Sequence, residues 1–320
     1  MVRIGINGFG RIGRCVARHI LDERNDLEIV KINATGDYDS NSHLLHYDSI
    51  HGRWKGTLNG KVEWSHTRDI NECDWSSVDV VLECTGAFND GDIAKTHLDN
   101  GAGKVVISAP AKNVDRTVVY GVNHTDILPE ETMISNASCT TNCLAPMVKV
   151  LHQEFGIKRG VMTTVHSYTG DQSTVDRRHK DPYRARTAGM SMIPTSTGAT
   201  KNIGKIIPDL DGKLTGSAIR VPTANVSCVD FTFQSETELS VEDINLAFAK
   251  YSHHYMNGVL GYETQPLVSI DYNHTSESCI VATDQTQVID KHMGRVLGWY
   301  DNEWAFSCRM ADTASYIGYL

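Results

Sequence analysis

Nine residues at positions 135–143, SNASCTTNC, crowd small polar side chains around two cysteines, Cys139 and Cys143. Three interpretations compete: a reactive thiol, a metal site, or structural thiols within a turn. A zinc site needs further Cys or His residues at ligand spacing. None follow, so the sequence predicts no metal. The polar neighbours favour a reactive thiol, and a helix beginning at Cys139 would lower its pKa from about 8.5.

A nucleophilic thiol needs a base. His166 follows soon afterwards, in the stretch TTVHSYTGDQ, which has the composition of a strand. Spacing alone leaves open whether His166 pairs with Cys139 or is a structural histidine.

The elements that would position these residues follow from periodicity. Apolar residues at 144, 148, 151 and 155 predict a helix that starts near Cys139 and stops at Gly156. Before it, apolar strands alternate with helices, as in a parallel sheet covered on both faces. After it, longer alternating strands indicate a mixed or antiparallel sheet. The predicted fold class is α/β: a Rossmann-type, doubly wound dinucleotide-binding domain (1–138 and 302–320) plus an α+β catalytic domain (139–301).

A glycine-rich loop supports the first assignment. The motif GFGRIG follows a predicted strand and opens a predicted helix, the context that a dinucleotide site requires. Its first glycine permits a tight turn, its second lets a pyrophosphate approach the backbone, and its third lets helix and strand pack closely. The loop residues are Gly8, Phe9, Gly10, Arg11, Ile12 and Gly13.

The end of the second predicted strand bears on the choice of cofactor. An acidic residue usually binds the ribose hydroxyls of NAD here. This chain instead has Ala34, between Asn33 and Thr35, and its next acids are Asp37 and Asp39. The missing carboxylate permits NADP, although a displaced Asp could still serve NAD.

Composition narrows the class of protein. The chain has 320 residues, a formal net charge of −9 and eight cysteines. The acidic balance disfavours a dedicated nucleic-acid partner. No signal peptide or membrane-length apolar run is evident, so we expect no membrane partner, a cytoplasmic location and reduced thiols.

Taken together, INGFGRIGR, SNASCTTNCLAP, HSYTGDQ, PTSTGATK, RVPT and WYDNEW, in this order, resemble the phosphorylating glyceraldehyde-3-phosphate dehydrogenase family over nearly the whole chain. The resemblance implies oxidation of glyceraldehyde 3-phosphate with NAD(P) and inorganic phosphate, in glycolysis or gluconeogenesis. Cys139 would form a thioester, His166 would act as base, and the enzyme would be a homotetramer.

The resemblance also implies ligand sites. Substrate phosphate would bind Thr169 and Arg220, with Asp171 as an orienting residue. The attacking phosphate would bind Ser138, Thr140, Thr197 and Gly198, and Arg184 matches a phosphate-site arginine. The additional family cofactor contacts are Arg68, Thr85, Gly86, Ser108 and, for the nicotinamide carboxamide, Asn302.

Two departures from the family pattern favour NADP over NAD. One is Ala34. The other is the pair Arg177 and Arg178, in a loop that reaches the cofactor of a neighbouring subunit in the family. Guanidinium groups there could bind a 2′-phosphate; the alternative is a pair of solvated surface charges.

Two other functions stay open. Erythrose-4-phosphate dehydrogenase belongs to the same family, but its members weaken the attacking-phosphate site, whereas PTSTGATK is intact here. A non-catalytic binding protein or adhesin could also keep the fold. A requirement for inorganic phosphate would distinguish the triose-phosphate enzyme from erythrose-4-phosphate dehydrogenase. Inactivity of the reduced protein would favour the binding protein or adhesin.

Overall fold

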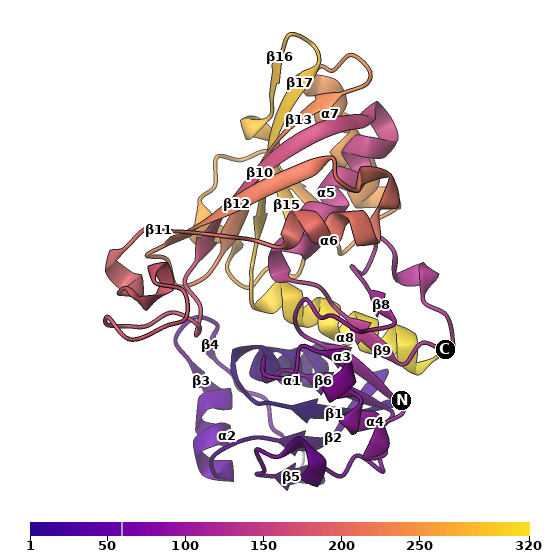
Figure 1. Cartoon of the computed structure of the whole chain (residues 1–320), viewed down its shortest axis with the longest axis vertical. Coiled ribbons are helices and arrows are strands. Elements are labelled where there is room, and N and C mark those ends of the chain that lie inside the picture. Colours follow the sequence, from indigo (N-terminus) through magenta and orange to yellow (C-terminus); the bar gives the residue numbers. More distant parts are fainter. Residues whose placement is uncertain (59) are drawn as a thin grey trace. The chain divides into compact units, whose positions relative to one another are not determined.

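The computed structural model describes residues 1–58 and 60–320. The chain divides into two compact units: Met1–Ser138 with Phe306–Leu320, and Cys139–Ala305 (Figure 1). Within the described part of the chain, no helix has both the length and the apolar character needed to cross a membrane.

The first unit is built on a seven-stranded sheet with the order β5-β2-β1-β6-β7-β9-β8, in which every neighbouring pair is parallel. The strands are β1 (Val2–Asn7), β2 (Leu27–Asn33), β5 (Glu63–Ser65), β6 (Val80–Glu83), β7 (Lys104–Ile107), β8 (Arg116–Thr117) and β9 (Met133–Ser135). A separate hairpin joins β3 (Tyr47–Asp48) to β4 (Gly52–Arg53). Strand order runs outward in both directions from β1, which confirms the predicted doubly wound sheet.

The helices of this unit are α1 (Arg11–Glu23), α2 (Tyr38–His46), α3 (Gly91–Ala94) and α4 (Thr96–Asp99), with most of α8 (Trp304–Gly318). Short 3₁₀ turns are η1 (Ile70–Glu72) and η2 (His124–Asp126). The helix predicted to follow the glycine-rich motif is confirmed as α1, whose buried face includes Cys15, Val16 and Ile20. Around the fully buried Trp75, apolar side chains form a core under the sheet.

The second unit contains an eight-stranded sheet with the order β11-β12-β10-β13-β17-β15-β14, and β16 pairs with β17. Parallel pairs (β10 with β12, β14 with β15) are combined with antiparallel ones, which confirms the predicted mixed sheet. The strands are β10 (Ile157–Ser167), β11 (Ile193–Thr195), β12 (Leu214–Val221), β13 (Ser227–Ser235), β14 (Leu260–Glu263), β15 (Cys279–Ala282), β16 (Gln287–Ile289) and β17 (Met293–Tyr300).

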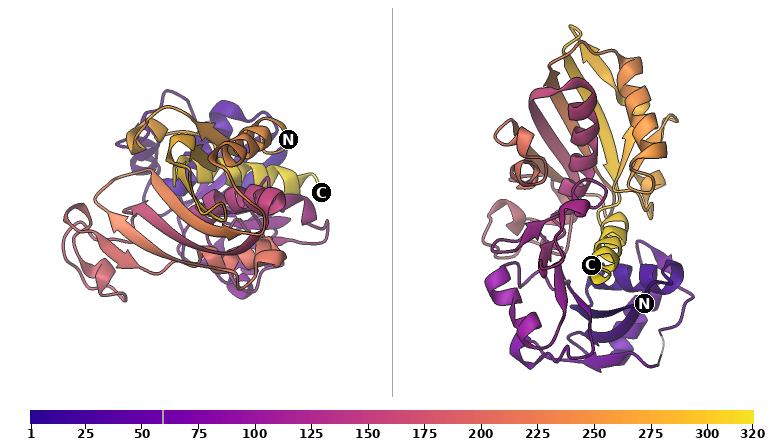
Figure 2. Two further views of the ribbon diagram at one scale, coloured as in Figure 1. Left: turned by 90° about the horizontal axis from the view of Figure 1, so that it is seen from above. Right: turned by 90° about the vertical axis from the view of Figure 1, so that its right-hand side faces the viewer.

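Three helices pack beside this sheet: α5 (Cys139–Phe155), α6 (Ala199–Ile206) and α7 (Val241–His254). Helix α5 contacts β13, β15 and β17, and it lies between α6 and α7; Figure 2 shows α5 and α7 side by side in its right panel. Short 3₁₀ turns are η3 (Tyr183–Ala185), η4 (Ala188–Met190), η5 (Pro208–Leu210), η6 (Ser269–Tyr272) and η7 (Thr283–Gln285). The chain leaves α5 at Gly156, whose φ of 66° suits a residue without a side chain.

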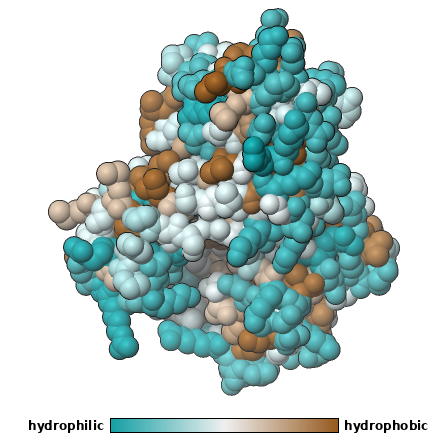
Figure 3. Space-filling view, turned by 45° about the horizontal axis from the view of Figure 1, so that its top comes forward, coloured by the Kyte–Doolittle hydropathy of each residue, from teal (hydrophilic) through white to brown (hydrophobic). Residues whose placement is uncertain are grey.

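The other face of the sheet leaves apolar side chains accessible. By strand register Val161, Ile219 and Met293 share this face, and their exposed fractions are 56%, 37% and 46%. Figure 3 shows such apolar patches, in brown, among the hydrophilic side chains that cover much of the surface in that view. An open, partly apolar sheet face is a feature that subunit association can cover.

Candidate active site

The glycine-rich loop leaves β1 and enters α1 with the geometry that each glycine was predicted to need. Gly8 has a φ of 95°, and a Cβ there would meet the Thr85 backbone nitrogen at 2.7 Å. A Cβ on Gly13 would lie 2.1 Å from the Gly8 carbonyl oxygen, so these two positions exclude side chains. Gly10, the N-cap of α1, faces open space instead, since its Cβ would meet nothing within 4 Å. An anionic group can therefore approach the first N–H groups of the helix.

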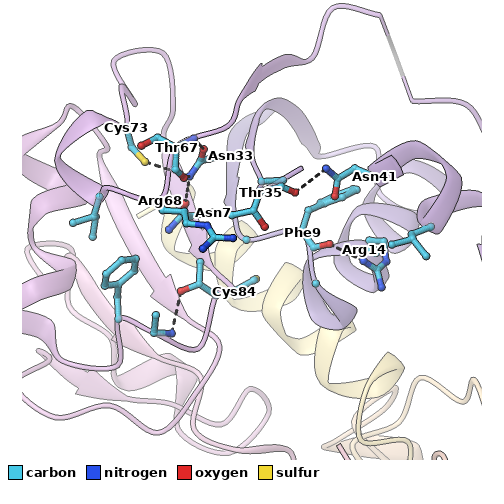
Figure 4. Close-up of a pocket in the computed structure, with 18 residues that line it drawn as sticks. Asn7, Phe9, Arg14, Asn33, Thr35, Asn41, Thr67, Arg68, Cys73 and Cys84 are labelled. Carbon is cyan, nitrogen blue, oxygen red and sulfur yellow. Dashed lines mark hydrogen bonds between the residues drawn. The ribbon is translucent and has the colours of Figure 1, made fainter. Parts of the chain in front are cut away.

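Beside this loop lies a cavity of about 570 Å³ in the first unit (Figure 4). Eight residues predicted to bind cofactor line it: Gly8, Phe9, Gly10, Asn33, Ala34, Thr35, Arg68 and Thr85. Ten others were not predicted: Asn7, Arg14, Asn41, Leu44, Thr67, Ile70, Cys73, Cys84, Ala87 and Phe88. Asn7 and Cys84 stand at the carboxyl ends of β1 and β6, a position that could have marked them as pocket residues.

Some residues of the first unit that were predicted to bind the cofactor are not among the described residues that line this cavity. They are Arg11, Ile12, Gly13, Gly86 and Ser108. The Arg11 guanidinium makes a bidentate pair with Asp48, so its side chain is committed elsewhere.

The charged side chains that line the cavity are positive. Among the described residues that line it there is no carboxylate, whereas Arg14 and Arg68 both contribute to the wall. Asp37, the nearest acid after Ala34, caps α2 by accepting a hydrogen bond from the Ser40 backbone N–H. The described lining of the pocket thus contains no carboxylate that could bind the ribose hydroxyls, and it contains two arginines that could bind a phosphate.

The floor of the cavity is held by a hydrogen-bond chain across the last residues of neighbouring strands. The Ser65 hydroxyl donates to Asn33, whose amide donates to Asn7 at 2.8 Å. The Asn7 amide then donates to a Glu83 carboxylate oxygen at 2.6 Å. Figure 4 shows Asn7, Asn33 and Thr67 gathered on one side of the cavity and Arg14 on the other.

Glu83 is completely buried, and four donors satisfy its carboxylate. The carboxylate oxygen that accepts from Asn7 also accepts from His97 Nε2 at 3.1 Å. The other oxygen accepts from the backbone N–H and hydroxyl of Thr85. Because Trp75 Nε1 donates to His97 Nδ1 at 2.9 Å, the proton of a neutral His97 must lie on Nε2. This arrangement compensates a buried carboxylate with four hydrogen bonds.

In the second unit, Cys139 is the first residue of α5, and His166 lies near the end of β10. The Cys139 sulfur is 3.4 Å from His166 Nε2. His166 Nδ1 is 2.7 Å from the Ser167 carbonyl oxygen, which can accept the Nδ1 proton and so leave Nε2 free to accept one from the thiol. The structure thus brings the predicted nucleophile and base together.

Electrostatics keep this pair neutral in the free protein. Burial, and then the positive charge of Arg220, lower the pKa of His166 to about 3. Desolvation raises the pKa of the Cys139 thiol, although Arg220 and the hydrogen bonds of Thr140 act in the opposite direction. The backbone N–H groups at the start of α5 act in the predicted direction, but the predicted net lowering of this pKa is wrong for the free protein, because loss of hydration outweighs the favourable interactions.

The predicted substrate-phosphate ligands lie beside the pair. Arg220 faces His166 across β12 and β10, and its Nη1 donates to the Ser167 carbonyl at 2.9 Å. The same nitrogen is 3.5 Å from the Thr169 hydroxyl. Asp171 instead holds Arg184 through a 2.6 Å contact, so it orients this second arginine.

The residues predicted for the attacking phosphate come from separate segments. Thr140 lies in the first turn of α5, and its hydroxyl is 2.9 Å from the Tyr300 hydroxyl, a partner that sequence reasoning missed. Thr197 and Gly198 precede α6, where the Thr197 hydroxyl accepts from the Ala199 N–H. Ser138 precedes α5 and ends the first unit.

Three further predicted cofactor residues lie in the second unit. Asn302 is buried and follows β17. Arg177 and Arg178 are exposed, and neither guanidinium has a hydrogen-bond or ion-pair partner among the described residues. Their side chains are available to an external anion.

Comparison with known proteins gives the family. The model described as glyceraldehyde 3-phosphate dehydrogenase, NAD binding domain, matches residues 2–91, and that described as the C-terminal domain of the same enzyme matches residues 138–302. A protein of Cereibacter sphaeroides named glyceraldehyde-3-phosphate dehydrogenase is 50% identical over 100% of this chain and 99% of its own length. The protein of this name from Xanthobacter flavus is also 50% identical, with the same coverage, and that from Pseudomonas aeruginosa is 49% identical over 98% of this chain and 97% of its own.

The chain therefore belongs to the glyceraldehyde 3-phosphate dehydrogenase family, whose members are NAD(P)-dependent oxidoreductases.

Proposed function

We propose that this protein oxidises D-glyceraldehyde 3-phosphate, with NAD(P) and inorganic phosphate, to 1,3-bisphosphoglycerate through a thioester on Cys139. The contact of 3.4 Å between the Cys139 sulfur and His166 Nε2 carries the proposal, because covalent catalysis needs a thiol with a base in reach. The same contact argues against a non-catalytic binding protein or adhesin.

In this mechanism His166 takes the thiol proton as the sulfur attacks the aldehyde carbon and returns it to the carbonyl oxygen, giving a hemithioacetal. His166 next takes the hydroxyl proton as the hydride leaves. When bound, the nicotinamide cofactor supplies the hydride acceptor. Inorganic phosphate then displaces Cys139 from the resulting thioester, and the sulfur leaves as the thiolate.

Arg220 connects substrate binding to the base. Its guanidinium lies 3.0 Å from His166 Nδ1 and lowers the pKa of the imidazole. A substrate phosphate on Arg220 and Thr169 would bring negative charge that offsets this effect. His166 would then be a stronger base with the substrate in place than without it.

For the attacking phosphate we assign Ser138, Thr140, Thr197 and Gly198, with Arg184 as the nearby cation. Arg184 is held by Asp171 and the Thr195 hydroxyl, which supports a fixed orientation toward an anion. We assign cofactor binding to residues 1–138 and 302–320 and catalysis to residues 139–301. The two compact units, which divide after Ser138 and Ala305, support this division.

We further propose that NADP is preferred to NAD. The positive, carboxylate-free lining described above and Ala34 support this preference for the adenosine side of the cofactor. Arg177 and Arg178 support it from a neighbouring subunit, if the protein is the homotetramer we propose. The accessible apolar side chains on the sheet of the second unit support self-association. A cytoplasmic location would suit eight free cysteines.

The decisive experiment compares initial rates for glyceraldehyde 3-phosphate with NADP and NAD, with and without inorganic phosphate, and with erythrose 4-phosphate as the alternative substrate. The proposal expects phosphate-dependent turnover and a higher kcat/KM with NADP. Turnover of erythrose 4-phosphate without a need for phosphate would contradict it, as would inactivity of the reduced protein.

A second experiment tests the arginine pair. Replacing Arg177 and Arg178 with Ala should raise KM for NADP by at least about tenfold and leave KM for NAD within about twofold, since a charge-assisted hydrogen bond contributes roughly 1.5–3 kcal/mol and about 1.4 kcal/mol equals a factor of ten. Lys180→Ala, an exposed charge in the same loop, is the matched control. Equal effects on the KM values for NADP and NAD would mean that the two arginines are solvated surface charges and do not bind the 2′-phosphate.

A further inference from the structure

The ends of three neighbouring strands of the second unit enclose the side chain of Asn302. Ser167 ends β10, Ser227 begins β13, and Asn302 follows β17, which pairs with β13. The Ser167 and Ser227 hydroxyl oxygens lie 2.7 and 3.0 Å from Asn302 Oδ1. Ser167 and Ser227 are 0% and 1% exposed, and Asn302 is 5% exposed, so water cannot replace these bonds freely.

Proton accounting determines which end of the Asn302 amide faces the serines. Each hydroxyl has one proton to donate, and the Ser167 backbone N–H already donates to the Ser227 hydroxyl oxygen at 3.0 Å. With Oδ1 facing inward, both hydroxyl protons have an acceptor.

The reversed amide would present its own N–H groups to the two hydroxyl oxygens. The serines could then share one hydrogen bond across their separation of 3.3 Å. One hydroxyl proton would lack an acceptor among the described residues, in a site closed to water. Because an unsatisfied buried donor is unfavourable, the amide oxygen must face inward and Nδ2 must face away from the serine pair.

We propose that Ser167 and Ser227 are positioning residues that hold Asn302 so that its Nδ2–H₂ group donates to the carbonyl oxygen of the nicotinamide carboxamide. The inference rests on the proposed cofactor role of Asn302. The backbone carbonyl oxygen of Ser167 also lies 2.7 Å from His166 Nδ1. A Ser167→Ala variant removes the hydroxyl and keeps that carbonyl, so the two roles of Ser167 can be separated.

The orientation predicts which cofactor analogues bind. The 3-acetylpyridine analogue of NADP keeps the carbonyl oxygen and lacks the carboxamide NH₂ group. If Asn302 donates to the oxygen, the wild-type protein should bind this analogue within about threefold of NADP. If Asn302 instead accepted from the NH₂ group, the analogue would lose a hydrogen bond, and its Kd would rise by about tenfold, equivalent to ~1.4 kcal/mol.

The test measures Kd for NADP, its acetylpyridine analogue and 2′-phospho-ADP-ribose, which lacks nicotinamide. Replacing both Ser167 and Ser227 with Ala should raise the Kd for NADP by about tenfold and leave the Kd for 2′-phospho-ADP-ribose within about twofold of the wild-type value. Ser235→Ala, which removes a buried hydroxyl at the far end of β13, is the matched control and should change neither Kd. A structural role alone would lower thermal stability without separating the two ligands.

The inference would be overturned by an unchanged NADP Kd in the double variant or by equal weakening of NADP and 2′-phospho-ADP-ribose binding. An acetylpyridine analogue that binds the wild-type protein about tenfold more weakly than NADP would also overturn it. Asn302→Ala identifies which proposal has failed. If it weakens NADP while the serine variants do not, Asn302 still binds cofactor and the serine role is wrong. If it leaves NADP unchanged, the cofactor role of Asn302 fails, and the inference fails with it.

Discussion

Replacing His166 with Asn tests the catalytic pair most directly. Asn cannot accept a proton from the Cys139 thiol, which lies 3.4 Å from the imidazole nitrogen. A general base contributes roughly 10²–10⁴-fold to a rate, and each factor of ten corresponds to about 1.36 kcal/mol of activation free energy. We therefore expect the first hydride transfer to slow by this factor, a rise of about 2.7–5.4 kcal/mol in its barrier.

The pH dependence supplies a sharper signature than the rate alone. In the free protein the pKa of His166 is lowered to about 3, so before substrate binds the imidazole is deprotonated throughout the range from pH 5.5 to 8 and can act as base. In the variant, only thiolate that is already present can react, and burial raises the thiol pKa. Below that pKa the thiolate fraction falls about tenfold for each pH unit. The logarithm of the rate should therefore rise with pH with a slope near one in the variant and much less steeply in the wild type.

Single-turnover absorbance measurements at saturating cofactor would give both rates across this pH range. Alkylation of Cys139 by iodoacetamide, without substrate, would report thiolate formation separately from hydride transfer. His253→Asn, an exposed histidine of α7, serves as the matched control and should behave as wild type. A loss below about tenfold, or the same pH slope in variant and wild type, would refute the assignment of His166 as base.

Three further predictions concern the nucleophile, the pocket floor and acid stability. Cys139→Ser should abolish product formation while cofactor Kd stays within about twofold, because the hydroxyl is a far weaker nucleophile; retention of most of the rate would exclude the thioester. Glu83→Gln should lower the free energy of unfolding by about 2–4 kcal/mol, since the amide NH₂ group would face the Asn7 and His97 donors in one orientation and the Thr85 backbone N–H in the other. Chemical unfolding would measure this, and a change below ~0.5 kcal/mol would contradict the buried carboxylate. The pKa values of His166 and His19 are lowered to about 3 and 4, so the unfolded chain binds more protons as pH falls below 6.5, and the folded state loses stability. His166→Asn should then reduce the slope of unfolding free energy against pH, near pH 5 and at fixed protein concentration, by up to about 1.4 kcal/mol per pH unit, and an unchanged slope would show that the imidazole is not held neutral.

Local patterns in the sequence were enough to predict the elements and the family. Helix α1 and the end of α5 at Gly156 follow from apolar spacing and a glycine stop, which depend on neighbouring residues alone. The need for glycine at positions 8 and 13 was also predictable, because a tight turn and a close packing contact each demand a residue without a side chain. The approach of a pyrophosphate to Gly10, which faces open space, stays a prediction. The same loop and the SNASCTTNC segment carried the resemblance to the family.

The tertiary structure decided which distant residues meet. Cys139 and His166 are 27 positions apart, and they come together because β10 returns beside the start of α5. Burial in that setting reverses the expected direction of the Cys139 pKa, an effect of lost hydration that sequence spacing cannot show. Ser227 reaches Asn302 through the pairing of β13 with β17 and not through any motif. Sequence periodicity specifies which face of an element is apolar, but the partners of each buried polar group depend on strand order and packing, which form only in the folded chain.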